Sequence, residues 1–116
     1  MKKLFVYDLP LYDDVVKALK ERGFRVMSYL GKVPISGTVT EINCGELIEK
    51  GGMYFNLYKS KINLYKSKIK GEIEEVSVLI IEVSETKVNW LDGILKSLGI
   101  KLTRRSDLEE EVRTRG

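Results

Sequence analysis

The sequence predicts a single α+β domain, because its 116 residues combine strand-like apolar runs with two helix-like patterns. Leu4–Tyr7 and Val76–Val83 are short apolar runs rich in β-favouring residues, which is typical of buried strands. Residues 11–22 and 88–98 instead place apolar side chains three and four positions apart, the spacing of one helix face. The order is therefore strand, helix, several strands and a late second helix.

Composition excludes several kinds of chemistry. The chain has no histidine and a single cysteine, so histidine-based catalysis, histidine metal sites and an internal disulfide are all excluded. The net charge of +3, from 20 basic and 17 acidic residues, is too small to indicate nucleic-acid binding by itself. No apolar run reaches the roughly 18 residues of a membrane span. The first residues lack the pattern of a signal peptide. We therefore expect a cytoplasmic protein that is not associated with a membrane.

The first strand leads directly into a candidate binding site. Leu4 to Tyr7 are followed by Asp8, Leu9 and Pro10, a turn cluster that precedes the first helix pattern. A turn between a strand and a helix often holds a carboxylate or phosphate, because its backbone N–H groups are unpaired. Tyr7 and the three turn residues are therefore candidate ligand-binding residues. The alternative is that they only end the first core strand.

The next elements follow from helix and turn signals. Leu11–Arg22 is predicted to be a helix, with Gly23 as its C-terminal cap. Phe24–Leu30 is predicted to be a strand, residues 31–37 to be rich in turns, and Thr38–Ile42 to be a further strand.

A segment of seven residues occurs twice without change, as Asn56–Ile62 and Asn63–Ile69. A helix would place both copies on one face, whereas a strand would place them on opposite faces, because seven is odd. The Tyr, Ser, Ile and Asn content favours strands, so we predict a long hairpin that projects from the body. Its lysines and tyrosines resemble a nucleic-acid surface, but lysines also protect exposed strand edges, and we favour the second role.

The last third of the chain is predicted to hold a central strand and a second helix. Val76–Val83 is that strand, and Ser84 is expected to cap a helix that ends at Gly99. A short strand is predicted over Ile100–Arg104. Residues 106–116 are expected to form an edge strand or a frayed helix.

Two segments resemble the gamma-glutamylcyclotransferase-like family, which includes the plant AIG2-like proteins. They are Leu4-Phe-Val-Tyr7 before the first turn and Ile80-Ile-Glu-Val-Ser-Glu-Thr-Lys-Val-Asn-Trp-Leu-Asp92, followed by an arginine-containing strand at Ile100–Arg105. The resemblance covers roughly residues 3–112. It implies a mixed, mostly antiparallel β-barrel with flanking helices.

The family resemblance also implies a reaction and a ligand. In the family, N–H groups of the first turn bind the α-amino acid end of a γ-glutamyl compound, and a glutamate after the late helix acts as general acid–base. The substrate's own amine attacks its γ-carbonyl, which releases 5-oxoproline without a metal or cofactor. The resemblance therefore implies a γ-glutamyl or amino-acid-like ligand and no cofactor. Separately, an apolar edge of the predicted hairpin would allow two copies to pair, so we expect a monomer or a homodimer.

This chain departs from the family pattern both in the first turn and at the position of the catalytic glutamate. Asp8 and Leu9 replace the family's glycine and its serine or threonine, and Pro10 offers no N–H. The family's glutamate aligns near Leu95, and leucine cannot move a proton. We therefore expect a divergent member that lacks standard cyclotransferase activity but keeps a ligand cavity near the first turn.

Two other functions stay open at this stage. Glu85 or Asp92 could replace the lost glutamate, which would make an active cyclotransferase with a relocated carboxylate. Each of these residues otherwise fits a helix cap or a surface charge. Alternatively, the hairpin rich in lysine and tyrosine could bind nucleic acid or another protein.

Overall fold

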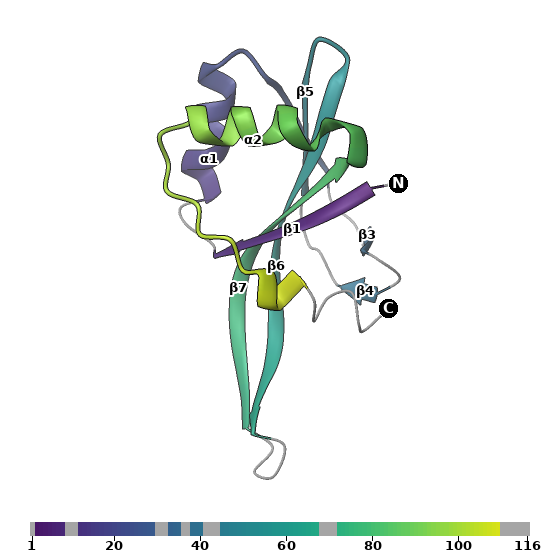
Figure 1. The fold of residues 1–116 in the computed structure, drawn as a ribbon, viewed down its shortest axis with the longest axis vertical. Coiled ribbons are helices and arrows are strands. Elements are labelled where there is room, and N and C mark those ends of the chain that lie inside the picture. The colour runs from purple at the N-terminus through teal and green to yellow at the C-terminus, as the bar shows by residue number, and fades with distance from the viewer. Residues whose placement is uncertain are drawn as a thin grey trace.

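A computed structural model describes residues 2–8, 12–29, 33–35, 38–40, 45–67 and 72–109. Strands and helices alternate only at the two ends of the chain, and strands follow one another between them (Figure 1). The elements are β1 (Lys2–Asp8), α1 (Tyr12–Glu21), β2 (Arg25–Tyr29), β3 (Val33–Ile35), β4 (Thr38–Thr40), β5 (Gly45–Lys50), β6 (Met53–Ser67), β7 (Glu72–Ser84), the 3₁₀ turn η1 (Glu85–Lys87) and α2 (Val88–Ser97). Residues 106–109 add one helical turn.

The main sheet has five strands in the order β1-β7-β6-β5-β2, and all four neighbouring pairs are antiparallel. Strands β3 and β4 form a separate small hairpin. The α+β prediction is confirmed. Among the described strands the sheet is open, because β1 and β2 are its two edges and no ladder joins them.

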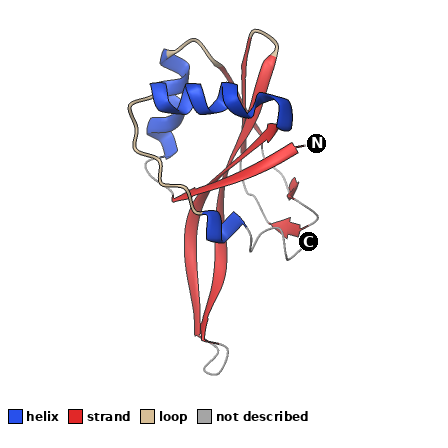
Figure 2. Cartoon of the chain, viewed as in Figure 1, coloured by secondary structure: helices blue, strands red, loops and turns tan. Residues whose placement is uncertain are grey.

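Strands β6 and β7 form a long hairpin that extends well beyond the rest of the sheet (Figures 1 and 2). The molecule is consequently elongated, with a longest axis of 50 Å against 27 and 26 Å for the other two. The predicted projecting hairpin is confirmed. The repeated segment does not form its two arms, because the first copy and most of the second lie in β6 alone.

A tight turn at Gly51 and Gly52 joins β5 to β6. Both glycines have positive φ, 61° and 84°, the conformation that a two-residue hairpin turn requires and that glycine adopts at least cost. The N–H of Gly52 also donates to Oε1 of Glu49 at 3.1 Å. This turn fixes the register in which Lys50 faces Met53, and with it the faces of both strands.

One face of the sheet packs against both helices (Figure 2). Helix α1 buries residues at spacings of three and four, and α2 buries Leu91 and Leu95, which are four apart, as expected of helices lying on a sheet. The cluster includes Phe5, Tyr7 and the aromatic group Phe24, Phe55 and Trp90. Alternation along β1 places Phe5 and Tyr7 on this face.

The opposite face of the sheet carries a smaller core. Leu4 and Val6 of β1 lie here with Tyr58, Val78 and Ile80, and Leu108 from the helical turn packs against them. The chain after α2 therefore crosses the end of β1 and reaches the other side of the sheet. This crossing creates the site described below.

Several sequence predictions are confirmed. The first strand, the first helix and the central strand all occur, as β1, α1 and β7. The predicted strands at residues 24–30 and 38–42 occur as β2 and the shorter β4. Gly23 and Gly99 follow the two helices with φ of 86° and 71°, as helix-ending glycines do.

Other predictions are wrong. Strands β3 and β5 were not predicted, and β3 lies inside the stretch expected to be turns. Ser84 makes no side-chain cap, and its Oγ instead lies 3.2 Å from Oγ1 of Thr86 within the start of η1. The predicted strand at Ile100–Arg104 is reduced to a single bridge between Arg104 and Tyr7. By contrast, residues 106–109 are helical, as the helix alternative for residues 106–116 expects, and the rest of that segment lies outside the described residues.

Within the described ranges, no helix is long and apolar enough to cross a membrane.

Candidate functional site

A pocket of about 240 Å³ lies where the end of β1 meets α2 and the chain that follows it. Six described residues line it: Tyr7, Asp92, Leu95, Lys96, Ile100 and Leu102. Asp92, Leu95 and Lys96 share one side of α2, because residues three and four apart on a helix are neighbours. Gly99, with φ of 71°, ends the helix and lets the chain turn back so that the two following aliphatic residues close the pocket.

The lining combines an apolar floor with three polar groups of different chemistry. Leu95 and Tyr7 are buried, whereas Asp92 and Lys96 are exposed at the rim. A carboxylate, an ammonium and a phenol are therefore presented to one small space. Asp92 and Lys96 are four residues apart, yet they form no ion pair with each other or with another described residue. Both charges thus remain available to a ligand.

The Tyr7 phenol is held in its neutral form. Burial raises the pKa of Tyr7 above its usual value of 10.0, the Arg104 guanidinium opposes this increase, and the carboxylates of Asp92 and Glu109 add to it. At neutral pH the hydroxyl is consequently a hydrogen-bond donor as well as an acceptor. It can donate to a carboxylate or carbonyl oxygen in the pocket.

The outer edge of β1 is completed by the segment after α2 instead of by another strand. The N–H of Asp8 donates to the carbonyl of Thr103 at 2.9 Å, and the N–H of Arg105 donates to the carbonyl of Val6 at 2.7 Å. The N–H of Val6 donates to Oε1 of Glu109 at 3.0 Å. A side-chain carboxylate therefore takes the place of a strand carbonyl at this edge.

Three ion pairs, formed by two arginines, order this segment. The Arg104 guanidinium donates to both oxygens of Glu109, at 2.8 and 3.0 Å, and lies 4.5 Å from the centre of the Phe5 ring. Arg105 donates to Oδ1 of Asp8 at 2.8 Å and to both oxygens of Asp107. These contacts fix residues 103–109 against β1, and thereby fix one wall of the pocket.

The structure brings together only some of the predicted site residues. Tyr7 and Asp92, from opposite ends of the sequence, line the same pocket. Asp8 instead faces Arg105 in an ion pair, and Glu85 lies exposed on η1 and does not line the pocket. Leu9 and Pro10 lie outside the described residues.

Sequence reasoning missed three lining residues, Lys96, Ile100 and Leu102. A signal for Lys96 was present, since it follows Asp92 by four residues and so lies on the same helix side. For the two aliphatic residues no such signal existed, because their position depends on the turn at Gly99. The sequence singled out Leu95 only because the resemblance aligns the family's glutamate near it. The Leu95 side chain lines the pocket.

Metal binding has no candidate among the residues that the structure describes, since no group of three or more Cys, Asp or Glu side chains there could hold an ion.

Comparisons of the chain with protein-family models, with curated proteins and with solved structures find no match. The function is therefore inferred from the pocket and from the residues that form it.

Replacing Tyr7 by phenylalanine is expected to change the alkaline end of the stability profile. Because the folded state raises the pKa of this phenol, the unfolded chain loses its proton first as the pH rises above about 10. The contribution of Tyr7 to stability is complete below that pH and is lost as the pH rises through the folded-state pKa. Urea midpoints measured from about pH 9 to about pH 12 should fall less steeply for Tyr7→Phe than for the wild type.

The matched control is Tyr54→Phe, a substitution at a tyrosine that is 49% exposed. Its profile should follow the wild type. Equal alkaline slopes for Tyr7→Phe and the wild type would contradict the assignment of a buried, proton-retaining phenol.

Proposed function

We propose that this chain is a divergent gamma-glutamylcyclotransferase-like protein that binds a small amino-acid-like molecule in the pocket and lacks the standard reaction. One observation carries the proposal: Tyr7 of the first strand, and Asp92 and Leu95 of the late helix, line one pocket. These are the two parts of the chain on which the family resemblance depends. Their meeting in space supports the placement of the ligand there.

The chemistry of the lining favours a ligand that carries both charges. Asp92 can accept hydrogen bonds from an α-ammonium group, and Lys96 can donate to an α-carboxylate. Leu95, Ile100 and Leu102 offer apolar surface to an aliphatic chain. The volume of about 240 Å³ lies below the roughly 300–1,000 Å³ typical of drug-sized ligands. An amino acid or a small γ-glutamyl compound fits these limits better than a nucleotide does.

The loss of the standard reaction rests on Leu95. This residue stands where the family carries the glutamate that moves protons, and it is only 8% exposed, within the wall of the pocket. An aliphatic side chain cannot act as a general acid or base. The turn carboxylate Asp8 does not compensate, because Arg105 binds it at 2.8 Å.

The mixed barrel of the family belongs to the proposal as well. Four antiparallel pairs separate β1 from β2, so these two edge strands run in the same direction. Closing the sheet into a mixed barrel would require a parallel pairing between them. The direction of the edge strands is consistent with that closure only along Lys2–Phe5, because Thr103, Arg105 and Glu109 already occupy the outer edge of β1 at Val6 and Asp8.

Binding to the pocket can be tested by calorimetric titration with free amino acids and γ-glutamyl compounds. We expect Asp92→Asn to weaken the binding of a ligand with an α-ammonium group by about tenfold, the effect of losing roughly 1.5 kcal/mol from one charge-assisted hydrogen bond. Glu85→Gln is the matched control, since it also removes one exposed carboxylate but lies outside the pocket. Equal affinities for the two variants would show that Asp92 does not contact the ligand. If none of the compounds binds, the proposal is contradicted.

A second candidate function is supported by the position of Asp92. A carboxylate beside the neutral phenol of Tyr7 is the arrangement that a cyclotransferase with a relocated general base would need. An assay for 5-oxoproline release from γ-glutamyl amino acids separates the two functions. The binding proposal expects no release. Release that Asp92→Asn abolishes would make the chain an active cyclotransferase.

A further inference from the structure

The projecting half of the long hairpin has two unpaired strand edges. Strand β5 pairs with β6 only as far as Tyr58, and β1 pairs with β7 only as far as Val78. Beyond these points, residues 61–67 of β6 and 72–77 of β7 pair with each other and with no other described strand (Figure 1). We call this part the ribbon. A free strand edge exposes backbone N–H and C=O groups that can pair with another chain.

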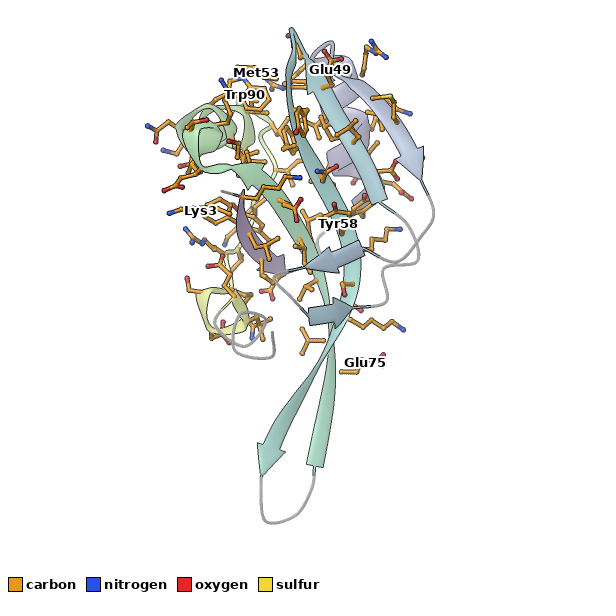
Figure 3. All side chains as sticks on the ribbon, turned by 90° about the vertical axis from the view of Figure 1, so that its right-hand side faces the viewer. Lys3, Glu49, Met53, Tyr58, Glu75 and Trp90 are labelled. Atoms are coloured by element: carbon orange, nitrogen blue, oxygen red, sulfur yellow. The ribbon has the colours of Figure 1, made fainter. Side chains whose placement is uncertain are left out.

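The two strands of the ribbon carry opposite charges. The β6 strand of the ribbon contributes Lys61 and Lys66 without any acidic residue, and the β7 strand contributes Glu72, Glu74 and Glu75 without any basic residue. Lys59 lies just before the ribbon, with its ammonium 4.7 Å from the centre of the Tyr12 ring. Lys61 and Glu75 form an ion pair across the ribbon at 3.3 Å. Glu75 is labelled on the ribbon in Figure 3, below Tyr58, where β6 leaves the body. The ribbon therefore has one basic edge and one acidic edge.

These charges determine which edges can meet. Two basic edges or two acidic edges side by side would place like charges opposite one another, which is destabilising. A basic edge beside an acidic edge places opposite charges together and completes both backbone ladders. Lysines alone would only protect an edge from pairing, whereas this ribbon also carries the acidic edge that neutralises them.

We propose that the chain binds a second copy of itself by pairing the β6 edge of one ribbon with the β7 edge of the next. A two-stranded hairpin is marginally stable alone, and a third strand adds both hydrogen bonds and cross-strand contacts. Because the contact joins two different edges, it leaves one free edge at each end of the assembly. Such head-to-tail contacts continue into larger species instead of stopping at a dimer.

The test measures molar mass by light scattering over a range of protein concentrations, at low and at high salt. For the wild type, we expect the mass to rise with concentration at low salt and to rise less at high salt, since exposed charges are screened. Two variants remove the complementarity: Lys61→Glu and Lys66→Glu together make both edges acidic, and Glu72→Lys, Glu74→Lys and Glu75→Lys together make both basic. Each variant alone should stay monomeric. A mixture of the two should associate.

A variant that carries all five substitutions is the control for folding of the ribbon. It exchanges the charges of the two edges but keeps their complementarity, so it should associate as the wild type does. A wild type that stays monomeric at all concentrations would overturn the proposal, as would self-association that neither charge variant reduces. Failure of both the mixture and the variant with all five substitutions to associate would also overturn it. Binding of a single-stranded oligonucleotide by a monomeric wild type would assign the lysines to nucleic acid instead.

Discussion

Replacing Glu109 by alanine is expected to lower the free energy of unfolding by about 3 kcal/mol. The Glu109 side chain is 5% exposed and makes three hydrogen bonds, two with Arg104 and one with the N–H of Val6. Its removal leaves the Arg104 guanidinium without its partner and a buried backbone donor without an acceptor. An unsatisfied buried group loses its interaction with water and gains nothing in return. Urea denaturation followed by far-ultraviolet circular dichroism measures the change.

The matched control for Glu109 is Asp107→Asn. Asp107 is another carboxylate of the same segment and also binds an arginine, at 3.1 Å, but its side chain is 63% exposed. Surface ion pairs contribute little because water and salt screen them. We therefore expect the urea midpoint of this variant to match that of the wild type. Similar losses for both variants would show that Glu109 has no special role at the β1 edge.

Replacing Phe55 by alanine is expected to cost about 4 kcal/mol of stability. Phe55 is fully buried in β6, and its ring contacts those of Phe24 and Trp90 with centres 6.3 and 5.8 Å away, at steep interplanar angles. Edge-to-face contacts of this kind add to the free energy of burial. Because the three rings come from the chain after α1, from the sheet and from α2, the cavity left by Phe55 cannot be filled by one local movement.

Tyr54 provides the comparison for Phe55 on the same strand. It is the neighbouring residue, it points to the other face of β6, and it is 49% exposed. Tyr54→Ala is expected to cost less than about 1 kcal/mol, as surface substitutions usually do. Thermal or urea unfolding of both variants measures the contrast. A loss at Tyr54 equal to that at Phe55 would contradict the assignment of the core to the helix-covered face.

The elements that the sequence predicts are those whose own residues determine them. Leu4–Tyr7, the helix pattern of α1 and the apolar run in β7 each have a clear period or composition. Strand β5 has neither, because its sequence Gly-Glu-Leu-Ile-Glu-Lys is rich in residues that disfavour strands. It is a strand because β2 and β6 pair with it on both sides. Its existence depends on distant residues that a local pattern does not include.

The prediction of a strand at Ile100–Arg104 was wrong for a related reason. Its apolar residues suggested pairing along β1, but only Arg104 bridges to Tyr7. At this edge the Glu109 carboxylate also accepts a hydrogen bond from the N–H of Val6. No sequence pattern distinguishes a glutamate that replaces a strand carbonyl from a glutamate on a surface.

The site was partly predictable for the same physical reasons. Tyr7 was identified from its position at the end of the first strand, and Asp92 from its place in the late helix. That they share one pocket is a tertiary property, set by the turn at Gly99 and by the segment fixed to β1. Asp8 was expected to face a ligand, and its pairing with Arg105, 97 residues away, could not be seen in the sequence.

The most direct test of the central claim is a nuclear magnetic resonance titration of the isotope-labelled protein with a γ-glutamyl amino acid. Ligand binding in the pocket is expected to cause saturable changes in the amide signals of Tyr7, Asp92, Lys96 and Leu102, with no 5-oxoproline formed in the same tube. Changes confined to other parts of the sheet, or no changes at millimolar ligand, would contradict the assignment of this pocket as the binding site.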